Sequence, residues 1–168
     1  MIKKRLFFLL FFFIYGCGDF KFVYDKEFKE IHRISDKTYI AVSGDSSESI
    51  YSYLVSRIGN KETEYEYKLS VYSSKIKEAS VIDKDATASK FRIKFIIDYS
   101  LVNKLQNCAV TNKSFETTSF FDAKSDGYSF GTDFSETTSS TNNIESNINE
   151  FISFLVLSDI NFDCINEN

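Results

Sequence analysis

The polar residues with the clearest spacing are Lys90, Arg92 and Lys94, which alternate with apolar residues in the stretch KFRIKFIIDYSL. Successive side chains of a β-strand point to opposite faces, so these three cations would lie in one row on one face. A row of ammonium and guanidinium groups can bind the phosphate or carboxylate groups of an anionic ligand. The alternative is a solvated outer face of a sheet, or a strand edge that lysine protects from aggregation.

Catalytic arrangements are weak in this sequence. The single histidine, His32, has no second imidazole for a metal site and no evident nucleophile as a partner. Residues 43–46 (SGDS) are better explained as a turn and a helix cap than as a phosphate-binding loop, because no lysine or repeated glycine follows them. We therefore expect that the protein is not an enzyme and has neither catalytic residues nor a metal site.

The thiol of Cys17 follows an almost unbroken apolar run, LFFLLFFFIY, which the basic residues 3–5 (KKR) precede. A charged head and a short apolar segment are typical of an export signal. The run has about half of the ~20 residues that a membrane-spanning helix needs. Residues 14–16 (IYG) resemble the lipobox of bacterial lipoproteins, in which the cysteine thiol receives a diacylglyceryl group and cleavage makes that cysteine the new N-terminus.

The lipobox resemblance implies a lipoprotein signal peptide over residues 1–16 and lipidation of Cys17, with palmitate among the acyl chains. This covalent lipid is the only cofactor that we expect, and each buried CH₂ group contributes ~0.8 kcal/mol to membrane attachment. By resemblance to enteric lipoproteins, Gly18 in place of an aspartate favours the outer membrane, periplasmic side. The alternatives are a buried or disulfide-bonded Cys17 and an uncleaved N-terminal helix.

Two further cysteines, Cys108 and Cys164, lie in the body of the chain. In an exported protein they could form a disulfide. Their spacing does not show that they meet, and two partly buried free thiols are the alternative.

The composition is that of one globular domain with an acidic surface. The 168 residues are enough for a single core, and the absence of proline favours long, uninterrupted elements. Removal of residues 1–16 takes away three of the 20 basic residues, so that 17 remain against 24 acidic residues and the net charge is −7. Such a surface does not favour nucleic acid, which we exclude as a partner.

Hydrophobic periodicity predicts the elements that would position these groups. A short strand over 38–42 precedes a helix in which Ile50, Leu54 and Ile58 share one face, and either Ser46 or Ser47 can cap that helix. Alternating strands are then expected within 64–77, 90–101 and, less clearly, 108–121.

A second helix is expected over about 139–157, where apolar residues recur at helical spacing. The segment 129–149 is rich in Ser, Thr and Asn, and locally predicts a loop or disorder. The order β-α-β-β-β-α predicts an α+β fold, with two helices packed on one face of a small, mostly antiparallel sheet of about four strands. The expected divisions are an acylated N-terminal tether (17–37), an α+β sandwich domain (38–160) and a C-terminal tail (161–168).

Taken in order, these features resemble the LPS-assembly lipoprotein family (LptE type), over nearly the whole chain. The family's lipidated N-terminus, first helix and Tyr-x-Leu strand have counterparts here. So does its Ala-Thr-Arg sequence before an alternating strand, with Lys90 at the arginine position. The matching stretches are 16–18 (GCG) followed by Phe20 and Tyr24, the region 39–58, 67–69 (YKL), 88–90 (ASK) and 99–101 (YSL).

The resemblance implies a non-enzymatic outer-membrane lipoprotein that binds and plugs a large β-barrel translocon (LptD type). It would assist the assembly of that barrel and the insertion of lipopolysaccharide at the cell surface. Lys90 would contact lipopolysaccharide, and strand geometry places Arg92 and Lys94 beside it. The alternative is a lipid-anchored periplasmic binding module or chaperone for a different envelope cargo.

Overall fold

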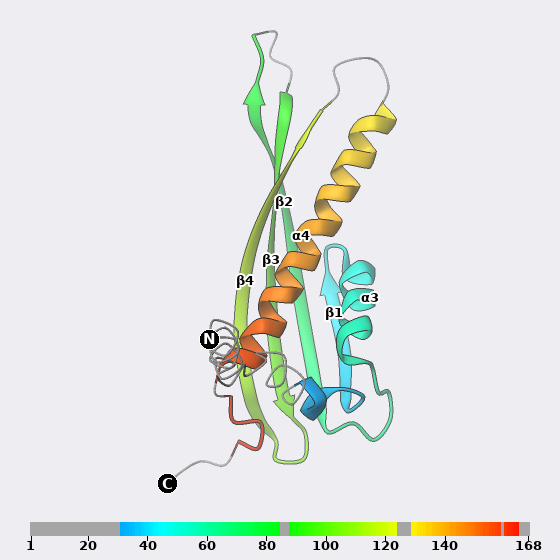
Figure 1. The fold of residues 1–168 in the computed structure, drawn as a ribbon, viewed down its shortest axis with the longest axis vertical. Coiled ribbons are helices and arrows are strands. Elements are labelled where there is room, and N and C mark those ends of the chain that lie inside the picture. The colour runs from blue at the N-terminus through cyan, green and yellow to red at the C-terminus, as the bar shows by residue number, and fades with distance from the viewer. Residues whose placement is uncertain (1–30, 85–87, 124–128, 159, 165–168) are drawn as a thin grey trace, which may run out of the picture.

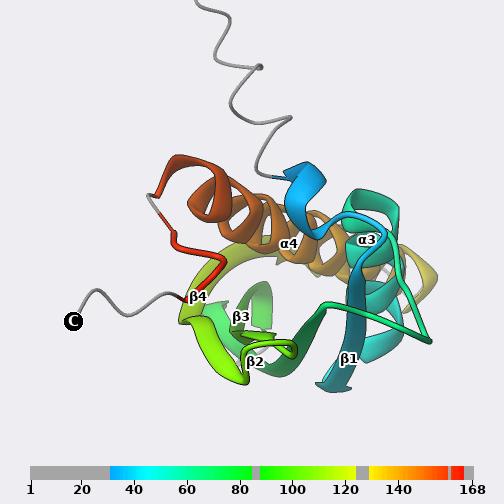
Figure 2. The same cartoon turned by 90° about the horizontal axis from the view of Figure 1, so that it is seen from below.

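The computed structural model describes residues 31–84, 88–123, 129–158 and 160–164. These residues form a four-stranded sheet with the spatial order β1-β2-β3-β4, and helices α3 and α4 pack on one of its faces (Figures 1 and 2). The predicted α+β fold is confirmed. Its elements are β1 (Thr38–Gly44), α3 (Ser47–Ile58), β2 (Tyr67–Ile82), β3 (Ala88–Asn103), β4 (Cys108–Asp122) and α4 (Ser129–Leu157).

The sheet combines one parallel pair with two antiparallel pairs. β1 runs parallel to β2, and α3 makes the crossover between them, while β2, β3 and β4 are antiparallel neighbours. β1 has only seven residues and pairs with Tyr67–Ser73, so the second half of the 16-residue β2 extends beyond it. Figure 1 shows the long strands β2 to β4 projecting well past β1 and α3. We call this projecting part the distal end.

The junction between β1 and α3 depends on one glycine. Gly44 has a φ of +93°, and a Cβ atom there would lie 2.0 Å from the backbone oxygen of Ser73. A side chain at this position would therefore be strained and would clash with β2. The next helix begins at Ser47 and Ser46 is its N-cap residue, one of the two serines expected there, but the side chain of Ser46 makes no capping hydrogen bond.

The core lies between the sheet and the two helices, as the periodicity predicted. The inward residues of β3 are completely or almost completely buried, and so are the apolar faces of α3 and α4. The ring of Tyr99 stacks on that of Phe151 with 4.0 Å between centroids, which joins the centre of β3 to α4. The buried residues of these three elements are Ile93, Phe95, Ile97, Tyr99 and Leu101, then Ile50, Leu54 and Ile58, then Ile144, Ile148, Phe151, Ile152 and Leu155.

The polar segment before residue 144 is helical, so the prediction of a loop or disorder over 129–149 was wrong. α4 begins at Ser129, ten residues before the expected start. Its polar side chains bind the sheet: the Nδ2 atom of Asn143 donates to the backbone oxygen of Ile93 at 3.0 Å, and that of Asn147 donates to the backbone oxygen of Phe115 at 2.9 Å. Tertiary hydrogen bonds thus overcome the low helix propensity of this segment.

The fold also takes in part of the expected tether and tail. Residues 31–34 form a helical turn, and Ile34 is buried in the core although it lies within the expected tether 17–37. At the other end, Phe162 of the expected tail 161–168 is buried, and its backbone oxygen accepts a hydrogen bond from Asn103 at 3.0 Å. The packed domain is therefore longer at both ends than the expected 38–160.

Candidate functional site

The sheet face opposite the two helices is the surface on which the site residues lie. Both helices cover the other face, as the end-on view shows (Figure 2). Alternate residues of β2, β3 and β4 point away from the helices and are half-buried or exposed. We call this surface the open face. No helix or strand among the described residues packs against it.

Two members of the predicted basic row are paired with carboxylates of neighbouring strands. Arg92 lies opposite Glu78 in the β2–β3 register and forms an ion pair with it. The hydrogen bond that Arg92 donates to the Glu78 carboxylate, together with the positive charge of Arg92, lowers the pKa of Glu78. The ammonium group of Lys94 lies 2.8 Å from a carboxylate oxygen of Glu116 on β4. The structure therefore brings these cations into one row but uses two of them in cross-strand pairs.

Lys90 has a different environment at the distal end. Its ammonium group lies 5.5 Å from the centre of the Phe120 ring, a cation–π contact. Among the described residues it has no ion-pair partner. Phe120 and Ile82 are 50% and 66% exposed, so apolar surface is available at the same end of the sheet. A cation at such a surface can contact a ligand that has both anionic and apolar parts.

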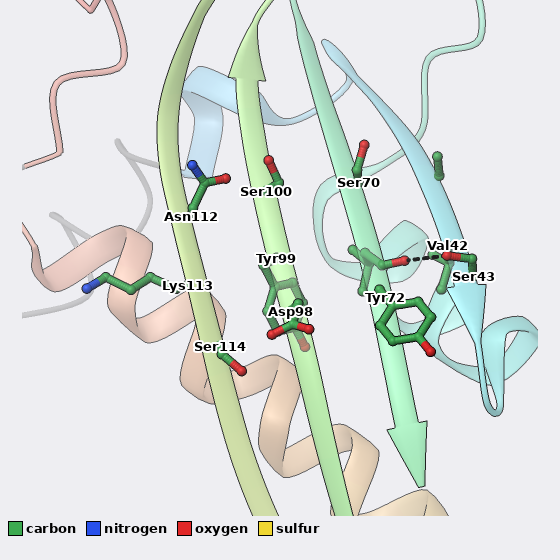
Figure 3. A pocket seen from close by; sticks show the side chains of 12 residues that line it. Val42, Ser43, Ser70, Tyr72, Asp98, Tyr99, Ser100, Asn112, Lys113 and Ser114 are labelled. Atoms are coloured by element: carbon green, nitrogen blue, oxygen red, sulfur yellow. Dashed lines mark hydrogen bonds between the residues drawn. The ribbon is translucent and has the colours of Figure 1, made fainter.

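A hollow of about 590 Å³ lies farther along the open face, beside β1 (Figure 3). Its floor is made of small residues from all four strands, and the aromatic ring of Tyr72 and the carboxylate of Asp98 stand in it. We call it the Asp98 hollow. The small residues of its floor are Ala41, Ser43, Ser70, Ser100 and Ser114.

Asp98 and Tyr72 occupy facing positions on β3 and β2, and Ser114 faces Asp98 from β4. Among the described residues, neither the Asp98 carboxylate nor the Tyr72 hydroxyl has a hydrogen-bond or ion-pair partner. The sequence analysis did not identify this pair. The available signal was an aspartate at an outward position within the predicted strand, directly after the apolar residues 95–97 (FII), since aspartate is depleted in strands.

A second charged cluster joins the distal end of β2 to α4 on the helix-covered face. Glu136 accepts hydrogen bonds from Lys75, at 2.9 Å, and from Lys77. Both hydrogen bonds lower the pKa of Glu136, and the bond from Lys77 has the larger effect. The ammonium group of Lys77 also lies 5.0 Å and 5.2 Å from the ring centres of Phe91 and Phe121. This cluster holds the first half of α4 on the sheet and so has a structural role.

The remaining candidate residues are distributed over the N- and C-terminal parts of the chain. Cys17, the predicted lipidation site, lies outside the described residues. Cys108 and Cys164 are joined in a disulfide with 6.3 Å between their Cα atoms. His32 is exposed on the helical turn 31–34.

Within the described ranges no group of three or more His, Cys, Asp or Glu side chains could hold a metal ion, and no helix there has the length and apolar character to cross a membrane.

No family model and no curated protein matches this sequence. Solved structures do match its fold. A candidate lipoprotein from Caulobacter crescentus has a TM-score of 0.58 at 12% identity, and the alignment covers 79% of this chain and 93% of the other.

Two further structures have the same arrangement. For a minor lipoprotein from Acinetobacter baumannii the TM-score is 0.55 at 8% identity, with 76% of this chain and 95% of that chain covered. For an uncharacterized lipoprotein B from Nitrosomonas europaea the TM-score is 0.52 at 10% identity, with 73% and 86% covered. At these identities the comparisons show a shared fold, and this fold is one that bacterial lipoproteins have.

Proposed function

We propose that the chain is a non-enzymatic envelope lipoprotein that binds and plugs a large β-barrel translocon of the outer membrane. Acylated Cys17 would anchor it to the periplasmic side, and it would assist the assembly of the barrel. The lipobox-like sequence before Cys17 and the fold shared with three bacterial lipoproteins support the anchor. The family resemblance of the sequence supports the choice of partner.

The observation that carries the proposal is the long open face of the sheet. It carries many polar groups beside its exposed apolar side chains: hydroxyl groups line the Asp98 hollow, and cross-strand ion pairs join Arg92 to Glu78 and Lys94 to Glu116. The interior of an outer-membrane barrel is polar, whereas its outer surface is apolar. A preformed face with hydroxyl groups and ion pairs is therefore better suited to the lumen of a barrel than to the lipid around it.

We extend the proposal to lipopolysaccharide, for which Lys90 is the contact that we favour. Unlike Arg92 and Lys94, Lys90 does not form an ion pair with Glu78 or Glu116, and its ammonium group contacts the Phe120 ring instead. The exposed side chains of Phe120 and Ile82 lie at the same end of the sheet and would contact acyl chains. The acidic surface farther away has little effect on this contact, because the Debye length is only ~8 Å at physiological salt.

A second candidate function is a lipid-anchored binding module or chaperone for a different envelope cargo. The Asp98 hollow favours it, because a hollow of this volume on an uncovered face can accept side chains of a smaller partner. In this case the cargo would be a soluble periplasmic protein instead of a membrane barrel.

In-cell photo-crosslinking tests the plug. A photoreactive amino acid replaces Ser114 on the open face or, as a matched control, Ser153 on the exposed side of α4. We expect Ser114 to crosslink an outer-membrane β-barrel, identified by mass spectrometry, in higher yield than Ser153. A soluble periplasmic protein trapped from Ser114 would favour the second function, and no barrel from either position would refute the plug.

The anchor has a separate test. The substitution Cys17→Ser should abolish labelling by a radioactive or clickable fatty acid and release the domain from membranes. Persistent membrane attachment of this variant would contradict acylation and favour an uncleaved N-terminal helix.

A further inference from the structure

The Asp98 hollow has a charge that the domain itself does not neutralise. Two other carboxylates of the open face, those of Glu78 and Glu116, form ion pairs with Arg92 and Lys94. Asp98 has no such partner among the described residues, although it occupies the middle of a central strand. Aspartate is unfavourable in that position, and residues that break a local rule are often found at functional sites.

The surroundings of Asp98 leave room for a cation. Facing Asp98 on one side is Tyr72, whose side chain is 56% exposed, and on the other side is the small Ser114. The lysine among the residues that line the hollow, Lys113, points to the other face of the sheet, where its ammonium group lies 5.3 Å from the centre of the Phe154 ring. No lysine or arginine of the described residues therefore fills the hollow.

We propose that the Asp98 hollow binds an arginine side chain of the protein partner, with the guanidinium group on the carboxylate of Asp98 and against the ring of Tyr72. This inference rests on the proposed function only in taking the open face as the surface that meets a protein. Arginine is a better occupant than lysine, because its planar group forms two parallel hydrogen bonds with a carboxylate and stacks on an aromatic ring. A metal ion is a worse occupant, because the hollow contains one carboxylate only.

The ring and the carboxylate contribute separately to this site. An exposed ion pair and an exposed cation–π contact are each weak. Together they predict weak binding of a free arginine, with a dissociation constant on the order of 30 mM or higher. In a complex, the surrounding contacts would hold the guanidinium group in place, so the hollow would select the partner rather than supply most of the affinity.

NMR titration of the acylated chain in detergent micelles tests the inference. The probe is N-acetyl-argininamide, and N-acetyl-citrullinamide is its uncharged counterpart of nearly the same shape. We expect saturable shifts of the amide signals of Tyr72, Asp98 and Ser114 with the arginine compound, and at least about fivefold weaker binding with the citrulline compound. Asp98→Asn should weaken arginine binding by about two- to fivefold, whereas the control Glu116→Gln should not change it.

The outcomes of this titration and of the crosslinking test are separable. If the two compounds bind equally, or if Asp98→Asn binds arginine as well as the parent does, the arginine site is refuted even when Ser114 crosslinks a barrel. If arginine binds as expected but no barrel is crosslinked, the site stands and the plug fails. Folding of Asp98→Asn is verified by the unchanged signals of the buried residues of α3.

Discussion

The hydroxyl group of Tyr99 on β3 donates a hydrogen bond of 2.9 Å to the Oδ1 atom of Asn147 on α4, inside the core. Both residues are almost completely buried, with 1% and 0% of their surface exposed. Burial raises the pKa of Tyr99 far above its ordinary value, so the phenol remains a protonated donor. The Nδ2 atom of Asn147 in turn donates to the backbone oxygen of Phe115. One asparagine thereby fixes α4 to both β3 and β4.

We expect Tyr99→Phe to lower the free energy of unfolding by about 1–3 kcal/mol, because it leaves the buried Oδ1 atom of Asn147 without a donor. Urea unfolding measured by circular dichroism checks this value. Tyr72→Phe is the matched control: it removes a hydroxyl group from an exposed tyrosine and should change the free energy of unfolding by less than about 0.5 kcal/mol. Equal effects of the two substitutions would show that the buried bond is not important for stability.

The disulfide between Cys108 and Cys164 should stabilise the domain strongly. It joins residues that are 56 positions apart, and closing a loop of this length restricts the unfolded chain by about 4 kcal/mol in the entropic model. We expect Cys108→Ser/Cys164→Ser to unfold at a clearly lower urea concentration than the parent. Both proteins are compared in a Cys17→Ser background, which prevents thiol exchange. Coincident unfolding curves would contradict the prediction.

The ion pairs of Glu136 should make stability depend on pH in the acid range. The folded pKa of Glu136 is lowered from 4.5, chiefly by its bond from Lys77, so its contribution is present above about pH 5 and is lost as the pH falls through the lowered value. Glu136→Gln should thus cost about 1 kcal/mol at pH 7 and progressively less at lower pH. Urea unfolding between about pH 3 and 7 measures the difference. A difference independent of pH would mean that the ion pairs do not contribute.

The parts of the fold that could be predicted are those in which apolar residues recur at a regular spacing. Strict alternation from Lys90 to Leu101 predicted the core face of β3, and the spacing of Ile50, Leu54 and Ile58 predicted α3. The first half of α4 could not be predicted, because its stability comes from hydrogen bonds between its Asn and Ser side chains and the sheet. Such bonds depend on strands that are distant in the sequence and leave no local periodicity.

The candidate site was predictable only in part, for a related reason. Alternation placed Lys90, Arg92 and Lys94 on one face, but the pairing of Arg92 with Glu78 depends on the β2–β3 register. The Asp98 hollow depends on four strands at once, since each contributes small residues to its floor. No single stretch of sequence contains that information. The predicted lipidation of Cys17 is a different case, because the apolar run and the glycine on which this prediction depends are contiguous in the sequence.

The last prediction distinguishes Lys90 from the paired Lys94 in the proposed binding of lipopolysaccharide. Lys90 has the Phe120 ring beside it and forms no ion pair among the described residues, although Asp122 faces it in the β3–β4 register, so its ammonium group can contact a phosphate group. We expect Lys90→Ala to weaken the binding of purified lipopolysaccharide about three- to fivefold in calorimetry, and Lys90→Arg to retain it. A matched control, Lys94→Gln/Glu116→Gln, removes a cation and its paired carboxylate together.

This control should leave the affinity within about twofold of the parent, because the net charge of the open face does not change and the lost cation was already neutralised. Higher salt should reduce the difference between Lys90→Ala and the parent, since the contact is exposed. If the double variant binds as weakly as Lys90→Ala, the row acts as a unit and the paired cations also contact the glycolipid. If neither substitution changes the affinity, the anionic ligand binds elsewhere, and the role of Lys90 is limited to its contact with Phe120.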